Sequence, residues 1–385
     1  MKILHLFSNH KWTGPAEPAV NLADELRKRG HQVLFGASQA ASQQGDIRRV
    51  HQHVVDRGLQ LLPGLRLAKH LNAGILADAA AIRSAVSEGG IELIHTHMRN
   101  DHFAAALAVR KLETPPPIVR TIYDGSPHRP TLRDRYLLGR HTDLAIFCSQ
   151  AVLSAWERLL AEHASAHVVD GAVDLARFDP KRTLPDMRTR LDLRAGDYVV
   201  GIVARIQPHR RFDRLLQAAA AAARQIPQFR LVIIGRGPDQ ARLIDQPARE
   251  MGIADVIRCP GYLMGDEYVG LLKALDVKAF LVPGSDGSCR AVREAMAMGL
   301  PVVAADRGML REIVEHEKTG LVVRGSGEEL GRAFIALHDD ARRQRMAAAA
   351  LEKARRSFNL ATQAAAVEAF YGRLKGGPIQ PEQQP

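Results

Sequence analysis

The sequence predicts an α/β protein of two doubly wound domains, each a parallel sheet covered by helices. The first observation is length, since 385 residues at roughly 150 per domain amount to about 2.6 domains. The second is that short apolar runs alternate with helix-like stretches in both halves, a pattern typical of parallel strands joined by helices. The third is a polar break at residues 175–197, after which the alternation restarts.

The N-terminal half begins with an expected strand at residues 3–7, a turn at Gly14-Pro15 and a helix. The apolar residues of that helix recur at helical spacing as far as Leu26, and Gly30 ends it. Further strands are expected at 33–37, 91–95, 118–122 and 144–147, with helices near 101–111 and 150–161.

The C-terminal half repeats the alternation. Strands are expected at 198–203, 230–234, 277–281 and 302–304, with helices near 212–225, 239–251, 288–299 and 327–338. The domains predicted from these elements are 1–180 and 181–358, followed by a helix at 359–374 that returns to the first domain. The tail at 375–385, rich in Gly, Pro and Gln, is expected to be disordered.

Composition excludes several classes of protein. Hydrophobic residues at 46% and charged residues at 25% are typical of a globular chain. The apolar runs are shorter than the roughly 18 residues that a membrane span needs, and the N-terminus lacks the apolar core of a secretory signal. Three scattered cysteines are too few for a disulfide framework. We therefore expect a cytoplasmic protein.

The net charge of +11 is unevenly distributed. Residues 1–180 hold 21 Lys and Arg against 18 Asp and Glu, whereas the rest hold 32 against 24. A basic half favours an anionic ligand. Basic residues interleaved with aromatic ones are not found, so nucleic acid is not expected. The basic residues at 342–356 are interpreted as a solvated surface.

The segment 282–306 carries the clearest chemistry. It reads as a strand end, a polar glycine turn, a helix, a glycine stop and a second strand. Free N–H groups at a helix N-terminus hold anions, so the turn at 287–290 is a candidate anion site. Asp286 precedes the helix and Glu294 lies two turns inside it, where they can bind separate hydroxyl-bearing parts of one ligand. Alone, an N-cap and a solvated helix face would account for both.

Five motifs in chain order are similar to those of one enzyme family. They are Gly14-Pro15-Ala16-Glu17; Asp170-Gly171-Ala172-Val173-Asp174 with Arg177-Phe178-Asp179-Pro180; Gly201 to Arg205 with Arg210; Gly235-Arg236-Gly237-Pro238; and the acidic pair Asp286 and Glu294. Together they extend over most of the chain and resemble the retaining glycosyltransferases of family 4, which have the two-domain GT-B fold.

This resemblance implies that a nucleotide diphosphate sugar binds the second domain and an acceptor mainly the first. Glu294 matches the residue that holds the ribose hydroxyls, and Asp286 the residue that contacts the donor sugar. Arg205 and Arg210 match a basic pair that stabilises the leaving diphosphate in place of a metal. The other nucleotide-sugar-binding candidates are Gly14, Gly235, Gly287, Ser288, Cys289 and Arg290.

Four residues depart from the family pattern. Asp286 replaces a glutamate and reaches less far, and Arg210 replaces a lysine with a planar, forked cation. Pro15 removes a backbone donor from the opening loop. Tyr123 stands where the family often has an active-site histidine.

The first domain offers three candidates near that position. His97 is expected to lie nearby and to substitute for the missing histidine as a catalytic group, and Tyr123 and Asp124 are acceptor-side candidates. His95 shares a strand face with His97. The pair could ligate a metal, but the sequence offers no evident third ligand, so no metal is expected.

The sequence thus predicts a metal-independent, cofactor-free retaining glycosyltransferase. It would move a sugar from a nucleotide diphosphate sugar to a glycan or lipid-linked acceptor, in bacterial cell-surface polysaccharide or lipopolysaccharide synthesis. At most, weak peripheral contact with the inner face of the membrane is expected. Two alternatives stay open: a nucleotide-sugar 2-epimerase of the same fold, which needs acid–base carboxylates and histidines in its cleft, and a nucleotide-sugar-binding protein that has lost catalysis.

Overall fold

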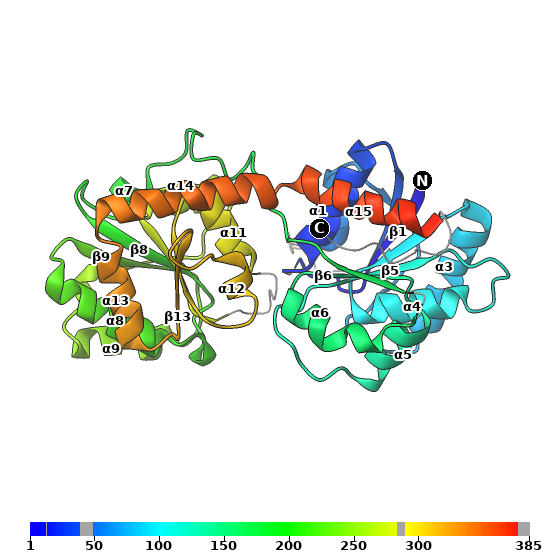
Figure 1. The fold of residues 1–385 in the computed structure, drawn as a ribbon, viewed down its shortest axis with the longest axis horizontal. Coiled ribbons are helices and arrows are strands. Elements are labelled where there is room, and N and C mark those ends of the chain that lie inside the picture. The colour runs from blue at the N-terminus through cyan, green and yellow to red at the C-terminus, as the bar shows by residue number, and fades with distance from the viewer. Residues whose placement is uncertain (13, 39–48, 163, 283–288, 376–385) are drawn as a thin grey trace. The chain divides into compact units, whose positions relative to one another are not determined.

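The computed structural model describes residues 1–12, 14–38, 49–162, 164–282 and 289–375, and it divides into two compact units (Figure 1). The N-terminal unit contains residues 1–171 and 360–375, and the C-terminal unit contains 172–282 and 289–359. Each unit is a parallel sheet with helices on both sides. The predicted class, α/β with two doubly wound sheets, is confirmed.

The N-terminal unit is built on a seven-stranded sheet in the order β3-β2-β1-β4-β5-β6-β7. Its strands are β1 (Lys2–Phe7), β2 (Gln32–Ala37), β3 (Gln60–Leu61), β4 (Leu93–Thr96), β5 (Ile118–Ile122), β6 (Leu144–Phe147) and β7 (Ser165–Val168). Its helices are α1 (Ala16–Lys28), α2 (Val50–Asp56), α3 (Ile75–Gly89), α4 (Arg99–Val109), α5 (Leu132–Arg140), α6 (Gln150–Trp156) and α15 (Leu360–Lys375), with a 3₁₀ turn at Glu157–Leu159.

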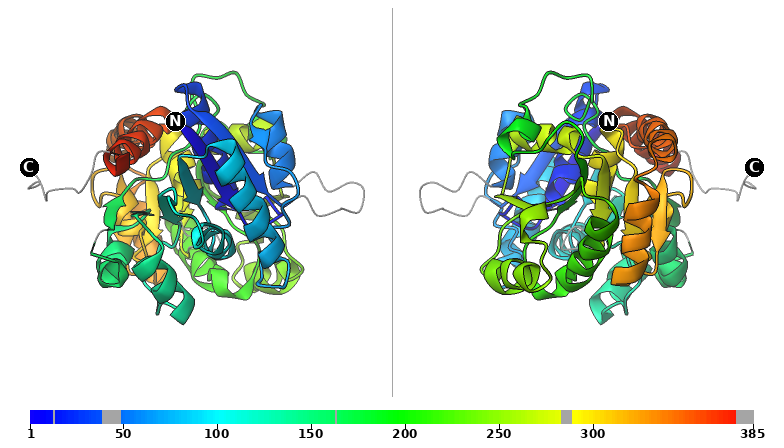
Figure 2. Two further views of the ribbon diagram at one scale, coloured as in Figure 1. Left: turned by 90° about the vertical axis from the view of Figure 1, so that its right-hand side faces the viewer. Right: turned by 90° about the vertical axis from the view of Figure 1, so that its left-hand side faces the viewer.

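Helices lie on both faces of this sheet (Figure 2), and alternate residues of its strands belong to two apolar layers. Ile3 and Phe7 pack on the side of α1 and α15, whereas Leu4 and Leu6 pack on the side of α3 and α4. A parallel sheet covered on both faces requires strands that are apolar throughout. His5 departs from this pattern, because it is wholly buried among them.

The C-terminal unit has a six-stranded parallel sheet in the order β10-β9-β8-β11-β12-β13. Its strands are β8 (Tyr198–Val203), β9 (Phe229–Ile234), β10 (Ile257–Gly261), β11 (Val277–Phe280), β12 (Val302–Ala305) and β13 (Gly320–Val323). Its α-helices are α7 (Met187–Arg190), α8 (Phe212–Gln225), α9 (Gln246–Glu250), α10 (Gly265–Ala274), α11 (Arg290–Ala297), α12 (Leu310–Ile313), α13 (Gly327–Ala336) and α14 (Asp340–Ser357). Short turns of other helix types lie at Pro208–Arg210, Ala241–Asp245 and Ala254–Val256.

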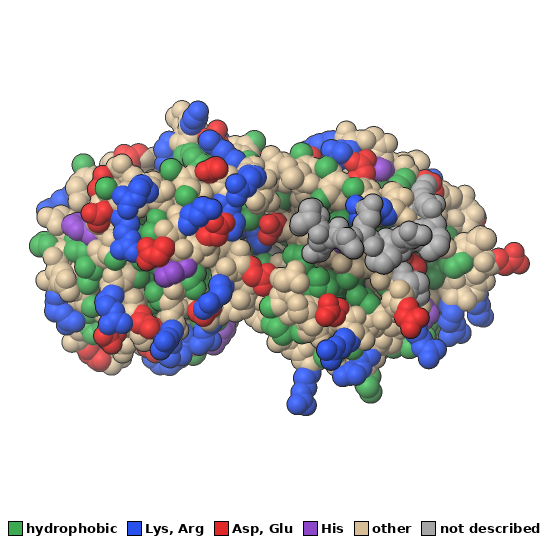
Figure 3. Space-filling model, viewed as in Figure 1, with side chains coloured by type: hydrophobic (Ala, Val, Ile, Leu, Met, Phe, Trp, Pro, Cys, Tyr) green, Lys and Arg blue, Asp and Glu red, His purple; other side chains and the backbone are tan. Residues whose placement is uncertain are grey.

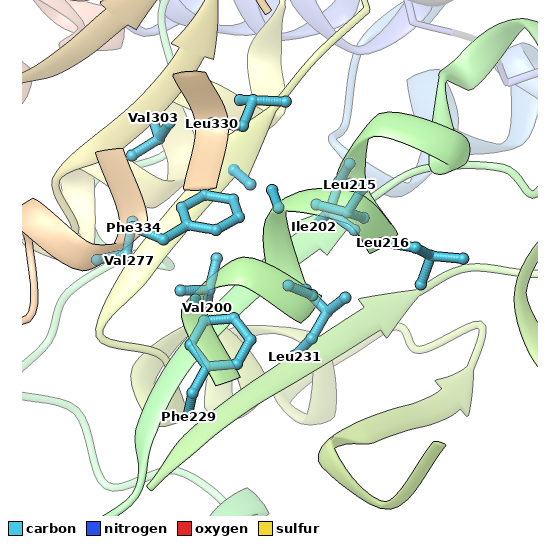
Figure 4. Close-up of a cluster of buried hydrophobic side chains, with 14 of the residues drawn as sticks. Val200, Ile202, Leu215, Leu216, Phe229, Leu231, Val277, Val303, Leu330 and Phe334 are labelled. Carbon is cyan, nitrogen blue, oxygen red and sulfur yellow. The ribbon is translucent and has the colours of Figure 1, made fainter. Parts of the chain in front are cut away.

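Helices α8 and α13 cover one face of this second sheet. The core between them contains Phe229 and Phe334, whose ring centroids lie 6.2 Å apart (Figure 4). The two helices can pack closely because small residues meet where they touch, and a Cβ added to Gly331 would lie 3.1 Å from Ala221 Cβ. The alanine-rich sequence of α8 therefore favours both the helix and its close packing.

The chain returns to the N-terminal unit through α15. Tyr371 of this helix is wholly buried, and Glu368 pairs with Arg29 and His31 beside α1. The first unit ends at Gly171 rather than at the predicted residue 180. The reason is that the following segment belongs to the C-terminal unit, where Val173 N donates to Phe358 O at 2.9 Å. The predicted disordered tail lies, from 376 onward, outside the described residues.

The four strands that the sequence pattern missed are β3, β7, β10 and β13, which are the four edges of the two sheets. β7 and β10 are only half-buried along their whole length. An edge strand has less surface to bury, so it lacks the continuous apolar run that marks a central strand.

The helix expected at 239–251 is also corrected, because it begins with a wide turn at Ala241–Asp245. Pro247 has no N–H to continue the regular hydrogen-bond ladder, which favours this widening. No helix in the described part of the chain combines the length and apolarity needed to cross a bilayer.

Of the basic residues of α14, Arg345, Arg355 and Arg356 are exposed as the sequence predicted, whereas Arg342, Arg343 and Lys353 are half-buried and paired. Arg342 pairs with Glu317 at 2.7 Å, and Lys353 with Glu315 at 2.8 Å. Figure 3 shows basic and acidic side chains interspersed over the visible face of this unit. The pair of Arg342 and Glu317 is the more exposed of the two, and such exposed pairs contribute little to stability.

Candidate functional site

The predicted basic pair follows β8 in the C-terminal unit. Arg210 Nη1 donates to the carbonyl oxygen of Val282 at 2.9 Å. Burial, and then the charge of Arg205, lowers the pKa of the Arg210 guanidinium. The buried Nε of Arg210 has no hydrogen-bond partner among the described residues. Leaving a buried donor unsatisfied costs about 1–3 kcal/mol, so an anion here would relieve that penalty.

Val282 is the last described residue before the glycine turn of the predicted anion site. The candidates Asp286, Gly287 and Ser288 fall in the segment 283–288, outside the described residues. The donor-sugar contact of Asp286 and the anion contacts of the turn therefore stay predictions.

Gly235 and Gly237 have a steric role in the loop that carries Arg205. A Cβ added to Gly235 would lie 1.9 Å from the carbonyl oxygen of Ala204, and one added to Gly237 would lie 2.0 Å from that of Ile206. Only glycine allows the turn after β9 to approach the loop after β8 this closely. The structure thus gives Gly235 a packing role, and its predicted contact with the nucleotide sugar stays a prediction.

Glu294 lies on α11, only 5% exposed, and is held from two sides. Tyr268 Oη of α10 donates to its Oε2 at 2.6 Å, and Arg290 Nε lies 3.1 Å from its Oε1. The carboxylate is therefore fixed in one orientation, which a solvated helix face would not achieve. Cys289 stands just before α11, buried and with φ of 51°. Sequence reasoning missed Tyr268 because it lies in a helix that the periodicity did not reveal.

Two buried cations lie in the same region as Glu294 and were also missed. Lys278 of β11 is wholly buried, and burial lowers its pKa to about 7 although the Glu294 carboxylate acts to raise it. Arg293 is 1% exposed and lies over the ring of Phe358 at 5.1 Å. In the sequence, the feature that could have revealed Lys278 is a lysine inside the apolar run Val277–Phe280.

In the N-terminal unit, the structure brings His97 and Tyr123 together. The two follow neighbouring strands, β4 and β5, and His97 Nδ1 lies 2.8 Å from Tyr123 Oη. His97 is wholly buried, whereas Tyr123 and the adjacent Asp124 are half-buried. The expected proximity is therefore present. Gly14 lies in the turn before α1 of this unit, and its predicted nucleotide-sugar contact stays a prediction.

His5 is a third histidine in this group, and sequence reasoning did not find it. Ring nitrogens of His5, His95 and His97 lie within 4.8 Å of one another. His95 and His97 stack with ring centroids 4.3 Å apart, and both nitrogens of His95 already bond Thr121 and Tyr371, at 2.7 and 2.5 Å. Stacked rings direct their nitrogens side by side rather than towards one point, so this arrangement fits a metal ion poorly.

Burial keeps these histidines neutral. It lowers the pKa of His5 to about 3 and the pKa of His95 and His97 well below the usual value. The cation Arg120 lowers the pKa of His95 and His97 further. Burial acts oppositely on an acid, and the pKa of the buried Asp101 carboxyl rises to about 7.

Comparison with known proteins agrees with the division of the chain into two units. Residues 14–177 match the family Glycosyltransferase Family 4, and residues 185–353 match Glycosyl transferases group 1. The D-inositol 3-phosphate glycosyltransferase of Salinispora tropica is 35% identical over 218 residues, which are 53% of this chain and 45% of that protein. The GDP-mannose-dependent alpha-mannosyltransferase of Mycobacterium tuberculosis is 27% identical over 335 residues, 80% of each chain. This chain spans about half the length of the first curated relatives it matches.

Solved structures show the same architecture. Anabaena HepE in complex with UDP has a TM-score of 0.78 at 22% identity, over 97% of this chain and 100% of that one. A glycosyltransferase from Rickettsia africae has a TM-score of 0.79 at 14% identity, over 98% and 99%. The fold is therefore GT-B. With one family match in each unit, the chain belongs to the family 4 glycosyltransferases.

Gly237→Ala tests the packing of the turn after β9 against the loop after β8. The added Cβ would meet the Ile206 carbonyl at 2.0 Å, so the loop that carries Arg205 must shift. We expect a loss of nucleotide affinity of tenfold or more, about 1.4 kcal/mol, measured by calorimetry. The control is Gly252→Ala, where an added Cβ has open space but φ is 67°, so only local strain arises. Equal affinities in all three proteins would contradict the steric role.

The neutral buried histidines predict acid sensitivity of the N-terminal unit. The unfolded chain takes up protons as pH falls below about 6.5. In the folded state, burial lowers the pKa of His5 and His102 to about 3 and the pKa of His95 and His97 well below its usual value, so these rings stay neutral. The Asp101 carboxyl, whose pKa burial raises to about 7, takes up a proton in the folded state below that pH. It therefore offsets the effect of one histidine on stability. The free energy of unfolding should thus fall by about 4 kcal/mol per pH unit below pH 6.

Urea unfolding followed by tryptophan fluorescence measures this slope, because both tryptophans, Trp12 and Trp156, lie in the N-terminal unit. His102→Gln should reduce the slope by one proton, about 1.4 kcal/mol per pH unit. An unfolding free energy that is constant from pH 7 to pH 5 would show that these rings are protonated in the folded state.

Proposed function

We propose that this protein transfers a sugar from a nucleoside diphosphate sugar to an acceptor hydroxyl, with retention of configuration and without a metal. The observation that carries the proposal is the guanidinium of Arg210, half-buried beside Arg205, with one buried N–H that has no hydrogen-bond partner in the described part of the chain. Breaking the bond between sugar and phosphate places negative charge on the leaving diphosphate. Cations beside the diphosphate, Arg210 held by Val282 and the exposed Arg205, would stabilise that charge most strongly in the transition state.

Glu294 would hold the ribose hydroxyls of the donor. Its carboxylate is kept buried and oriented by Tyr268 and Arg290 before any ligand arrives. Preorganisation of this kind reduces the entropy lost on binding. Asp286 and the turn at 287–288 would contact the sugar and diphosphate, as the family resemblance implies.

The acceptor would bind the N-terminal unit at the half-buried Tyr123 and Asp124, where the wholly buried His97 contacts Tyr123 from the next strand. Relatives named as mannosyltransferases of a phosphatidylinositol mannoside and as inositol phosphate glycosyltransferases favour a hydroxyl-rich, lipid-linked or glycan acceptor. We place the protein in the cytoplasm in cell-surface polysaccharide or lipopolysaccharide synthesis, with peripheral contact at the inner face of the membrane.

Arg210→Ala tests the leaving-group chemistry. Loss of one preorganised donor to the diphosphate should lower kcat about 100-fold or more, with a smaller effect on donor affinity. The matched control is Arg211→Ala, because the neighbouring Arg211 pairs with the exposed Asp213 and should affect kcat less than about twofold. Transfer assays with EDTA should match those without it. Activity that EDTA abolishes, together with a tolerated Arg210→Ala, would refute the mechanism.

Glu294→Gln tests the ribose contact. The amide keeps the shape of the side chain but loses its charge, so affinity for the bare nucleotide should weaken by about 1.5–3 kcal/mol. UDP, GDP and ADP are screened first by thermal shift, and the stabilising one is then titrated by calorimetry. Glu328→Gln, in an exposed pair with Arg332, is the control. Nucleotide affinity unchanged by Glu294→Gln would assign the residue a purely structural role.

A further inference from the structure

A chain of hydrogen bonds runs from the half-buried Tyr123 into the core of the N-terminal unit. Tyr123 Oη lies 2.8 Å from His97 Nδ1, and His97 Nε2 lies 2.9 Å from His5 Nδ1. At its inner end, the buried Nε2 of His5 has no hydrogen-bond partner among the described residues. All three side chains lie on the sheet face that α1 and α15 cover, since Ile3, Leu93 and Val119 on the same strand faces belong to that core.

The series of hydrogen bonds through Tyr123, His97 and His5 allows only two self-consistent arrangements of protons. A neutral imidazole carries one N–H and one bare nitrogen, and burial keeps both rings neutral because it lowers the pKa of each. If Tyr123 donates to His97 Nδ1, then His97 donates from Nε2 to His5 Nδ1, and His5 carries its proton on Nε2. If His5 donates from Nδ1 to His97 Nε2, then His97 donates from Nδ1 to Tyr123 Oη. The three groups therefore switch together or not at all.

The inner end of the chain decides between the two arrangements. In the first, a buried N–H of His5 is left without an acceptor, whereas in the second only a bare ring nitrogen is left. Unpaired buried N–H groups are the rarer and costlier of the two in folded proteins. The second arrangement is therefore favoured.

We propose that His5 and His97 both carry their protons on Nδ1, so that Tyr123 accepts from His97 and offers its own O–H outward, to substrate. His5 is then a positioning residue, which fixes the direction of the Tyr123 hydroxyl through His97. This proposal rests on the proposed function only in assigning the outward O–H to a substrate oxygen. The hydroxyl stays protonated throughout the working pH range, because burial raises the pKa of Tyr123 well above its usual value.

The proton positions are measured without activity. Long-range ¹H–¹⁵N correlation spectra of the full chain labelled in histidine distinguish a proton on Nδ1 from one on Nε2, and the His5 signals are those lost in His5→Asn. We expect the Nδ1–H form for both His5 and His97, unchanged between pH 6 and pH 8. Nε2–H on both rings would overturn the proposal, as would a cationic ring or rings whose signals shift on addition of Zn²⁺.

Two substitutions of His5 test the effect on transfer. His5→Phe keeps a ring but removes the donor, so kcat should fall about tenfold, the effect of losing one hydrogen bond, with nucleotide affinity unchanged. His5→Asn places an amide N–H near the original Nδ1 and should restore most of kcat. His102→Gln changes a buried histidine outside this chain, bonded to Thr142, and should lower stability without lowering kcat.

The outcomes separate the two proposals. If the wild-type protein transfers no sugar but His5 and His97 both carry their protons on Nδ1, the proposed function is refuted and the proposed proton arrangement is supported. Equal kcat losses in His5→Phe, His5→Asn and His102→Gln would show that His5 acts through stability alone, and would overturn its positioning role.

Discussion

Burial of both faces of two parallel sheets is the constraint on which the rest of this structure depends. Central strands such as β6 and β8 have apolar side chains on either face, so most polar chemistry is displaced to the ends of the strands. Arg205 follows β8, and Tyr123 follows β5. Ligand sites in doubly wound folds lie at these carboxyl ends for the same reason.

Both units bury polar groups, and the N-terminal unit buries the pair Arg120 and Asp101 as well as its histidines. The N-terminal unit buries histidines, which can become neutral and so avoid the cost of a buried charge. The C-terminal unit buries Lys278 and Arg293, and burial lowers the pKa of Lys278 to about 7 because the Glu294 carboxylate offsets only part of its desolvation.

Helix α15 contributes to the first unit from the far end of the chain. Tyr371 bonds His95 at 2.5 Å, and His95 in turn stacks on His97. The buried polar layer beneath Tyr123 is therefore incomplete until the last helix is in place. Ring contacts of this kind add about 0.5–1.5 kcal/mol beyond the burial of area, and they restrict the rotamers of the rings.

The sequence alone determined the fold class, the central strands, the basic pair and the proximity of His97 to Tyr123. The first three depend on local pattern or on motifs whose residues stand close together in the chain. The proximity of His97 to Tyr123, 26 positions apart, was expected because each residue follows a predicted strand. It did not reveal the four edge strands, since partial burial removes the continuous apolar run that marks a strand.

Only the tertiary structure decided which distant residues support the site. His5 meets His97 because β1 and β4 are neighbours in the sheet, although 92 positions separate the two residues in the chain. Tyr268 reaches Glu294 from α10 across 26 positions. Contacts between strands and helices that are remote in sequence carry no periodic signal, because they are set by the order and register of the sheet.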